Sequence, residues 1–276
     1  MIFSMDVPWT FLLIAGFAAY FQSITGFGLG MIVMGLAGGL GLVPMTQVVA
    51  VISLMTLVNC STALAGRLRQ VYWASVGAVL LGLVPMLILG VLMLNYLSAG
   101  ASALIQLLLG AVIIYGGLAL LMTPRGQAEV SKPASFTVFG AISGFFGGLF
   151  EIAGPPLIYH YYRQPLDWVR LRNTLLVLFG LASAARTIVI AIDGQLNADI
   201  LELTLWTLPV VFIGSTLARR WPPKLSARSI RGVAVLILLM MGSTLIVAGL
   251  SSAEGERAAA ETVSHSASAR WSGDLG

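Results

Sequence analysis

Long runs of apolar residues constrain the fold of this sequence more than any other feature. Eight such segments follow one another, over about 8–41, 47–66, 74–94, 103–122, 136–162, 174–192, 200–218 and 232–250. Most have the roughly 20 residues that a helix needs to cross a bilayer. Only 9% of all residues are charged, against about 25% in a typical soluble domain. The sequence therefore predicts an all-α integral membrane protein, whose first segment lacks the basic start of a secretory signal and should remain in the chain.

Two of these segments, the first and the fifth, are longer than a single crossing requires and are rich in glycine. They also resemble each other, because "ITGF" at 24–27 and "ISGF" at 142–145 each open a block of four apolar segments. We therefore expect two repeats, in which each long segment is a broken or hairpin element. The predicted organisation is a first membrane repeat over 1–123, a cytoplasmic linker over 124–135, a second repeat over 136–250, and a disordered polar tail over 251–276.

The basic residues follow the apolar segments unevenly. Lys and Arg occur after the second, fourth, fifth and seventh segments and are missing after the first, third and sixth. Because Lys and Arg collect in cytoplasmic loops, these four loops should share one face of the membrane. That arrangement is possible if the first and fifth segments enter the bilayer and return. Each repeat then has one re-entrant element and three crossings, so the second repeat is inverted relative to the first, as in many secondary transporters.

Glycines in the two long segments suggest a binding site. Irregular backbone at membrane depth must face protein or a water-filled cavity, and the short helix after each break would direct N–H groups there, which suits an anion. The alternative is that these glycines only let helices pack closely. The candidate glycines are Gly26, Gly28 and Gly30 in the first repeat and Gly147, Gly148 and Gly154 in the second.

The same segments resemble a known family. "FQSITGFGLGMIVMGLA" and "GAISGFFGGLFEIAGPPLIYHYY", with "RNT" after the second, are similar to the sulfite exporter TauE/SafE family, over about 17–250. The resemblance implies a bacterial inner-membrane transporter of sulfite, sulfonates or related small organic anions, without a cofactor. Two positions depart from the pattern, since Gly35 stands where the family often has proline and Glu151 where it usually has glycine.

Two ionisable side chains lie deep within the apolar segments. Such groups are costly in a membrane and usually face the bundle interior, paired or lining a pathway. Arg186, in the sixth segment, could bind a sulfonate or carboxylate through its planar fork. Glu151, in the fifth, is a candidate proton carrier for coupling. A simple ion pair between Glu151 and Arg186 is the alternative for both.

Polar side chains near these charges complete the candidate site. Hydroxyl and amide groups could bond anion oxygens, although Ser and Thr also bond back to their own helix or join helices together. The candidates are Asn59, Ser61 and Thr62 in the second segment and Ser183 in the sixth. Cys60 is expected to be a small packing residue, and His160 to Tyr162 an interfacial aromatic belt. No metal-ligand spacing, phosphate-binding loop or catalytic triad is visible in the sequence.

We therefore expect a multi-pass secondary transporter that moves a small anion by alternating access, with a proton or sodium ion as the candidate for coupling. Its expected partners are the anion and membrane lipid. A nucleic-acid partner is not expected, because the basic residues lie mostly in loops. The alternative from another class is an anion channel with re-entrant pore segments, and an intramembrane enzyme is disfavoured for want of paired catalytic groups. The sequence leaves the oligomeric state open.

Overall fold

The computed structural model describes residues 9–39, 45–98, 102–121, 127–221 and parts of 232–251. Every regular element in these residues is a helix, as expected. The elements are α1 (Trp9–Thr25), α2 (Leu29–Gly39), α3 (Met45–Leu64), the short 3₁₀ turn η1 (Leu68–Gln70), α4 (Trp73–Ser98), α5 (Ser102–Leu121), α6 (Pro133–Phe150), α7 (Gly154–Tyr162), α8 (Trp168–Ile192) and α9 (Ala198–Arg220). The predicted tail lies almost wholly outside the described residues, and so do parts of the predicted linker and of the eighth segment.

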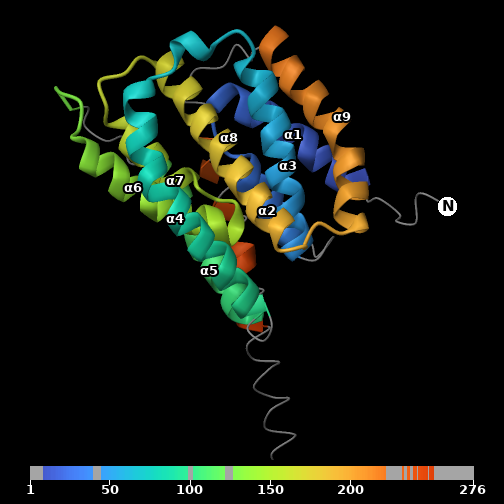
Figure 1. The fold of residues 1–276 in the computed structure, drawn as a ribbon. Coiled ribbons are helices and arrows are strands. Elements are labelled where there is room, and N and C mark those ends of the chain that lie inside the picture. Colours follow the sequence, from blue (N-terminus) through green and yellow to red (C-terminus); the bar gives the residue numbers. More distant parts are fainter. Residues whose placement is uncertain are drawn as a thin grey trace, which may run out of the picture.

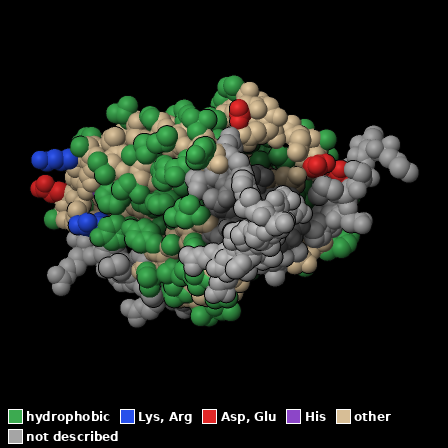
Figure 2. Space-filling view, turned by 90° about the horizontal axis from the view of Figure 1, so that it is seen from below, with side chains coloured by type: hydrophobic (Ala, Val, Ile, Leu, Met, Phe, Trp, Pro, Cys, Tyr) green, Lys and Arg blue, Asp and Glu red, His purple; other side chains and the backbone are tan. Residues whose placement is uncertain are grey.

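The described helices agree with an integral membrane protein. Five of them, α3, α4, α6, α8 and α9, are long and apolar enough to cross a membrane, and shorter apolar stretches occur in α1, in α5 and over Gly242–Ser251. Large apolar side chains such as Leu81 and Ile192 are exposed on their outer faces. On the face drawn in Figure 2, hydrophobic side chains cover much of the described surface and charged ones appear only at its edges. A lipid environment accounts for this surface, since soluble proteins rarely expose such large apolar areas.

The helices pack in pairs around a central pair. Figure 1 shows α3 and α8 side by side at the centre, with α4 and α6 on one side and α1 and α9 on the other. The α4 and α6 helices contact each other along much of their length, and α3 also packs against α9 while α8 packs against α4. The centre of the molecule is therefore built from α3 of the first predicted repeat and α8 of the second.

Glycines permit the close approach in both outer pairs. A Cβ atom on Gly144 of α6 would collide with the carbonyl oxygen of Leu83 on α4, and one on Gly148 with that of Leu87. In the other pair, a Cβ on Gly214 of α9 would lie 2.6 Å from the carbonyl oxygen of Gly16 on α1. Small residues commonly allow membrane helices to come this close. Gly148 was a candidate for the binding site. The structure instead shows it in the alternative role, which is close packing between two helices.

Both overlong apolar segments are broken helices. The first helix ends at Thr25 and α2 begins at Leu29, with Gly26 and Gly28 at φ values of +90° and +108° that favour glycine. The second break separates α6 from α7, and Glu151 takes a left-handed conformation there with φ 55°. Two prolines then open α7, where their fixed φ suits the first turn of a helix. The glycine and proline content of these segments therefore does produce the expected interruptions.

Candidate functional site

The two helix breaks meet at a small cavity in the centre of the molecule. Gly30, at the start of α2, lies against the backbone carbonyl of Glu151 in the second break so closely that a Cβ on Gly30 would collide with it. The cavity beside this contact has a volume of about 30 Å³, which is room for two or three water molecules at the roughly 10–15 Å³ that each requires. Its walls come from both breaks and from the central helices α3 and α8.

The helix α2 begins at this cavity. The amide of Ile32 donates to the carbonyl of Gly28 over 2.9 Å, so the amides of the three preceding helical residues have no acceptor within the helix. The start of α7 also lines the cavity through Gly154, but the next two residues are prolines without N–H groups. Backbone donors for an anion are therefore concentrated at the start of α2.

A buried ion pair stands in the second break. Arg186 Nε of α8 lies 3.7 Å from Glu151 Oε2, and both side chains are almost fully buried. Glu151 also accepts a hydrogen bond from the Ser183 hydroxyl, and Ser53 of α3 lies beside it. This pairing matches the alternative that the sequence left open for both charges, and it sets the positive charge of Arg186 beside the carboxylate of Glu151.

Only one member of the ion pair faces the cavity. Glu151 lines it, whereas the guanidinium of Arg186 lies behind Glu151, where Nη1 donates to the backbone carbonyls of Gly147, over 3.1 Å, and Gly148. These two carbonyls belong to the last turn of α6. In this structure Arg186 therefore closes the end of α6 as well as compensating Glu151.

The predicted site residues divide into those at the cavity and those elsewhere. Predicted residues that line the cavity are Gly28, Gly30, Gly147, Glu151, Gly154 and Ser183. Asn59 is fully buried but accepts a hydrogen bond from Ser23 over 2.8 Å. Thr62 donates to the carbonyl of Val58 on its own helix over 2.8 Å, and Ser61 is exposed on the opposite face of α3. Gly26 packs on Arg172, away from the cavity lining.

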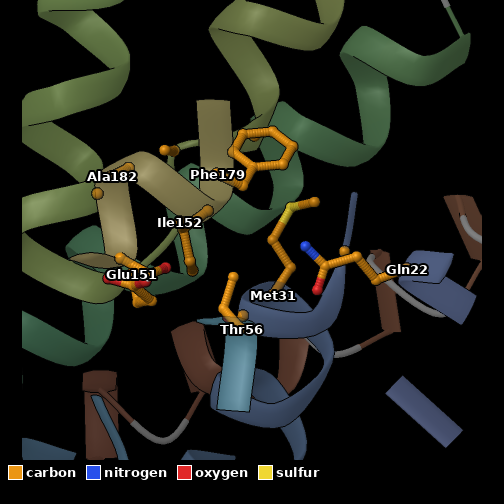
Figure 3. A pocket seen from close by; sticks show the side chains of 13 residues that line it. Gln22, Met31, Thr56, Glu151, Ile152, Phe179 and Ala182 are labelled. Atoms are coloured by element: carbon orange, nitrogen blue, oxygen red, sulfur yellow. The ribbon is translucent and has the colours of Figure 1, made fainter. Parts of the chain in front are cut away.

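Two polar cavity residues escaped the sequence analysis. Gln22 of α1 and Thr56 of α3 line the cavity, and Gln22 is only 3% exposed. Within the described residues, its Oε1 atom has no hydrogen-bond partner and its Nε2 has only a long 3.9 Å contact to Cys60 Sγ. Figure 3 shows Gln22 and Glu151 on opposite sides of the cavity, with Met31 between them. The missed signal for Gln22 was its place one helical turn before the glycines of the first break.

Arg172 was also missed, because the sequence analysis placed it in a basic loop. The helix α8 begins earlier, at Trp168, and Arg172 is only 8% exposed. The N-cap residue of α8 is Asp167, whose side chain accepts a hydrogen bond from the amide of Arg170 over 2.9 Å. This is a common way to begin a helix. The basic residues that follow the fifth segment thus do not share one environment, since Arg170 is exposed and Arg172 is buried.

The predicted aromatic belt at the end of the fifth segment is wrong for two of its three residues. His160 is 2% exposed and Tyr161 fully buried, so both pack within protein and not toward lipid. His160 stacks on Phe139 with ring centroids 4.4 Å apart, and the Tyr161 hydroxyl is 2.6 Å from that of Ser75. The burial arises because α7 packs inside the bundle against α5 and α6. Among the described residues, no group of His, Cys, Asp and Glu is placed to hold a metal ion.

Comparison with known proteins agrees with this architecture. The family model described as "Sulfite exporter TauE/SafE" matches residues 11–245. A protein of Cupriavidus necator named "Probable sulfite/organosulfonate exporter TauE" is 44% identical over 236 residues, which cover 86% of this chain and 92% of that protein. A "Probable inner membrane transporter protein TsaS" of Comamonas testosteroni is 25% identical over 178 residues, covering 64% of this chain and 73% of its own. No solved structure gives a significant match.

These findings agree with the resemblance noted from the glycine-rich segments. The match covers most of the chain and includes both broken helices and the central pair α3 and α8. The inner-membrane relative and the five apolar helices indicate a multi-pass transporter of the inner membrane. The chain belongs to the sulfite exporter TauE/SafE family.

Proposed function

We propose that this protein is a secondary transporter that moves a small anion across the bacterial inner membrane by alternating access. The anion is sulfite, an organosulfonate or a related organosulfur or carboxylate anion. The observation that carries this proposal is the cavity between two broken helices, where the first N–H groups of α2, which have no acceptor within the helix, lie near buried polar side chains. The 44% identical relative, named as a probable sulfite/organosulfonate exporter, supports the choice of substrate class.

The charges around the cavity suit a small anion. Glu151 would repel an anion if it stood alone, but Arg186 compensates it at 3.7 Å. The start of α2 then supplies a partial positive charge through its backbone amides. Gln22 adds an amide on the wall opposite Glu151, and Thr56 adds a hydroxyl from α3. Oxyanion oxygens would find donors from α1, α2 and α3 without a directly facing arginine.

The size of the cavity favours a mechanism with movement. A space that holds two or three water molecules is smaller than a sulfonate with an organic group. Binding must therefore widen the cavity, and the two breaks are natural points for this change because backbone there is not held by a continuous helix. This reasoning favours a carrier that opens and closes over a continuous anion channel.

The helix packing supports two repeats related by a twofold exchange, and the distribution of basic loops favours the inverted arrangement. Exchanging each element of the first predicted repeat for its counterpart in the second converts the α1–α9 pair into the α6–α4 pair, and both pairs are present (Figure 1). The same exchange converts α3–α9 into α8–α4 and leaves α3–α8 unchanged, and these contacts are present too. Inverted repeats place the substrate where the broken helices meet and let one repeat rock against the other.

A reconstituted transport assay tests the function. Purified protein in proteoliposomes should exchange internal for external anion in a saturable way, in a screen of sulfite, thiosulfate, sulfonates and carboxylates. Proteoliposomes with a Ser183→Ala variant provide a comparison, since Ser183 lines the cavity and bonds Glu151. A single-channel current in place of saturable counterflow would favour the channel, and failure to transport any of these anions would overturn the proposal.

A further inference from the structure

Two arginines of one helix reach the ends of both broken helices. Arg186 of α8 donates to the carbonyls of Gly147 and Gly148 in the last turn of α6. Arg172 of the same helix donates through Nε to the carbonyl oxygens of Ser23 (2.8 Å) and Ile24 (3.1 Å), in the last turn of α1. The two arginines are about four helical turns apart along α8. The central helix α8 therefore holds the end of each broken helix through one buried guanidinium.

The end of α1 needs such a partner. Where a helix stops, its last carbonyls lose their intrahelical donors, and lipid supplies no replacement. Past the break, the Gly26 amide bonds the Gln22 carbonyl over 2.7 Å, and the Phe27 amide turns to the Thr25 hydroxyl at 3.3 Å. The next two carbonyls after that of Gln22 belong to Ser23 and Ile24, and the Arg172 guanidinium donates to both. Its positive charge also complements the negative end of the helix dipole.

Arg172 is itself held in place on α8. Its Nη1 donates to Asn173 Oδ1, and Asn173 Nδ2 donates to Gln70 Oε1, each over 3.0 Å. No carboxylate of the described residues lies within ion-pair distance of Arg172, so its partners are backbone and amide oxygens. Gly26 packs directly on it, since a Cβ on Gly26 would lie 3.1 Å from Arg172 Cγ. Arg172 therefore supports the first break through hydrogen bonds and through packing against Gly26.

The end of α1 is also connected to the cavity. The residue whose carbonyl Arg172 binds, Ser23, donates through its hydroxyl to Asn59 Oδ1 of α3 over 2.8 Å, and the same hydroxyl oxygen lies 2.9 Å from that of Ser215 on α9. The residue before it, Gln22, lines the cavity. Displacing the end of α1 would thus move one wall of the cavity relative to Ser183, which lies on the same helix as Arg172.

We propose that Arg172 is a positioning residue of the transport site. By closing the end of α1 it sets where Gln22 and the first N–H groups of α2 stand relative to Ser183 and Glu151. It acts on the first break as Arg186 acts on the second, so that α8 keeps the two halves of the site in register. This inference rests on the proposed function and deepens it.

The test uses two variants, a matched control and two measurements. The variants are Arg172→Ala, which removes the guanidinium, and Arg172→Lys, which keeps the charge and loses the fork. Arg170→Ala is the control, because Arg170 carries the same charge two residues earlier but is exposed. The measurements are the KM for sulfite in proteoliposomes and the rate at which a maleimide labels Cys60. That thiol is the one cysteine of the chain and packs beside Gln22 of α1.

We expect Arg172→Ala to raise the KM by about tenfold or more, since hydrogen bonds to a charged group are worth roughly 1.5–3 kcal/mol. It should also speed the labelling of Cys60, because Gln22 of α1 contacts this buried thiol and would move away with the end of α1. Arg172→Lys should give a smaller change in the same direction, and Arg170→Ala should match the parent. A loss of folded protein alone would lower the maximal rate and leave the KM unchanged.

An Arg172→Ala protein with the parental KM and parental labelling of Cys60 overturns the inference. If this variant does not fold, Arg172→Lys decides, and a folded lysine variant with unchanged KM and labelling overturns the inference as well. If the parent protein does not transport sulfite, the proposed function fails for that anion, and the labelling of Cys60 still tests the position of α1. Faster labelling in the arginine variants then supports the positioning role and equal labelling refutes it.

Discussion

Adding one methyl group at Gly30 should disable the site with little change elsewhere. Gly30 begins the first turn of α2 and packs on the carbonyl of Glu151, so the Cβ of an alanine would collide with backbone that cannot rotate away. Gly30→Ala must therefore push the two breaks apart. Overpacking of this kind costs about 1–3 kcal/mol, and the higher helix propensity of alanine returns roughly 0.5–1 kcal/mol of it.

The expected result is a loss of function larger than the loss of stability. The net cost of up to about 2.5 kcal/mol follows from those two contributions and should lower the apparent melting temperature modestly. The rate of anion counterflow should fall by more than tenfold, because a wall of the cavity moves. Gly77→Ala is the matched control, since Gly77 lies inside α4 with open space around its missing Cβ. That variant should transport like the parent and be equally or slightly more stable.

The comparison is made on purified proteins with thermal unfolding in detergent and counterflow in proteoliposomes. Equal transport by the Gly30→Ala and Gly77→Ala proteins would refute the reasoning, because it would mean that the contact between the two breaks is irrelevant to the site. A Gly30→Ala protein that loses stability and transport in proportion would instead indicate a purely structural contact.

Three further outcomes follow from the charges. If Glu151 carries a proton, Glu151→Gln should bind substrate and abolish the pH dependence of transport; retained pH dependence in a folded variant would leave ion pairing as its role. Removing one partner of a buried pair typically costs about 3–5 kcal/mol, so Arg186→Ala should unfold at a much lower temperature and Arg186→Lys should recover part of the loss; parental stability of the alanine variant would contradict the role of this pair. In a Cys60-free background, single cysteines at Arg67 and Arg170 should react only from the cytoplasm and one at Asp199 only from outside, whereas labelling at 67 and 170 from opposite faces would exclude inverted repeats.

The broken helices were predictable because their cause is local. In the first break, two glycines adopt positive φ values that few other residues tolerate. In the second, a pair of prolines follows the end of α6. Both features interrupt a helix regardless of the surrounding fold. Grouping the glycines of both breaks in one candidate site also needed the repeat, since Gly30 and Glu151 are far apart in the chain. Here the similarity between "ITGF" and "ISGF" carried long-range information that a single segment does not contain.

The roles of the arginines were less accessible to sequence reasoning. Arg172 stands near the end of a basic loop in the sequence, yet it bonds the carbonyl of a residue 149 positions earlier. Nothing in the spacing of α1 and α8 indicates that contact, because it depends on how the bundle packs. Arg186 was recognised as buried, but its bonds to the α6 carbonyls depend on where α6 ends. Side chains that bond backbone leave no sequence pattern on the partner, since every residue has a carbonyl.

The left-handed backbone at Glu151 bears on how this site can change in evolution. A side chain in that conformation costs about 1–2 kcal/mol that glycine does not incur. Each glutamate codon is one nucleotide from a glycine codon, so one mutation can exchange them at this position without rebuilding the break. Loss of the carboxylate would relax the backbone but leave Arg186 without its acidic partner, although its bonds to the α6 carbonyls would remain. A lineage can therefore gain or lose an internal negative charge at this break in one step, while the bonds of Arg186 to the end of α6 stay in place.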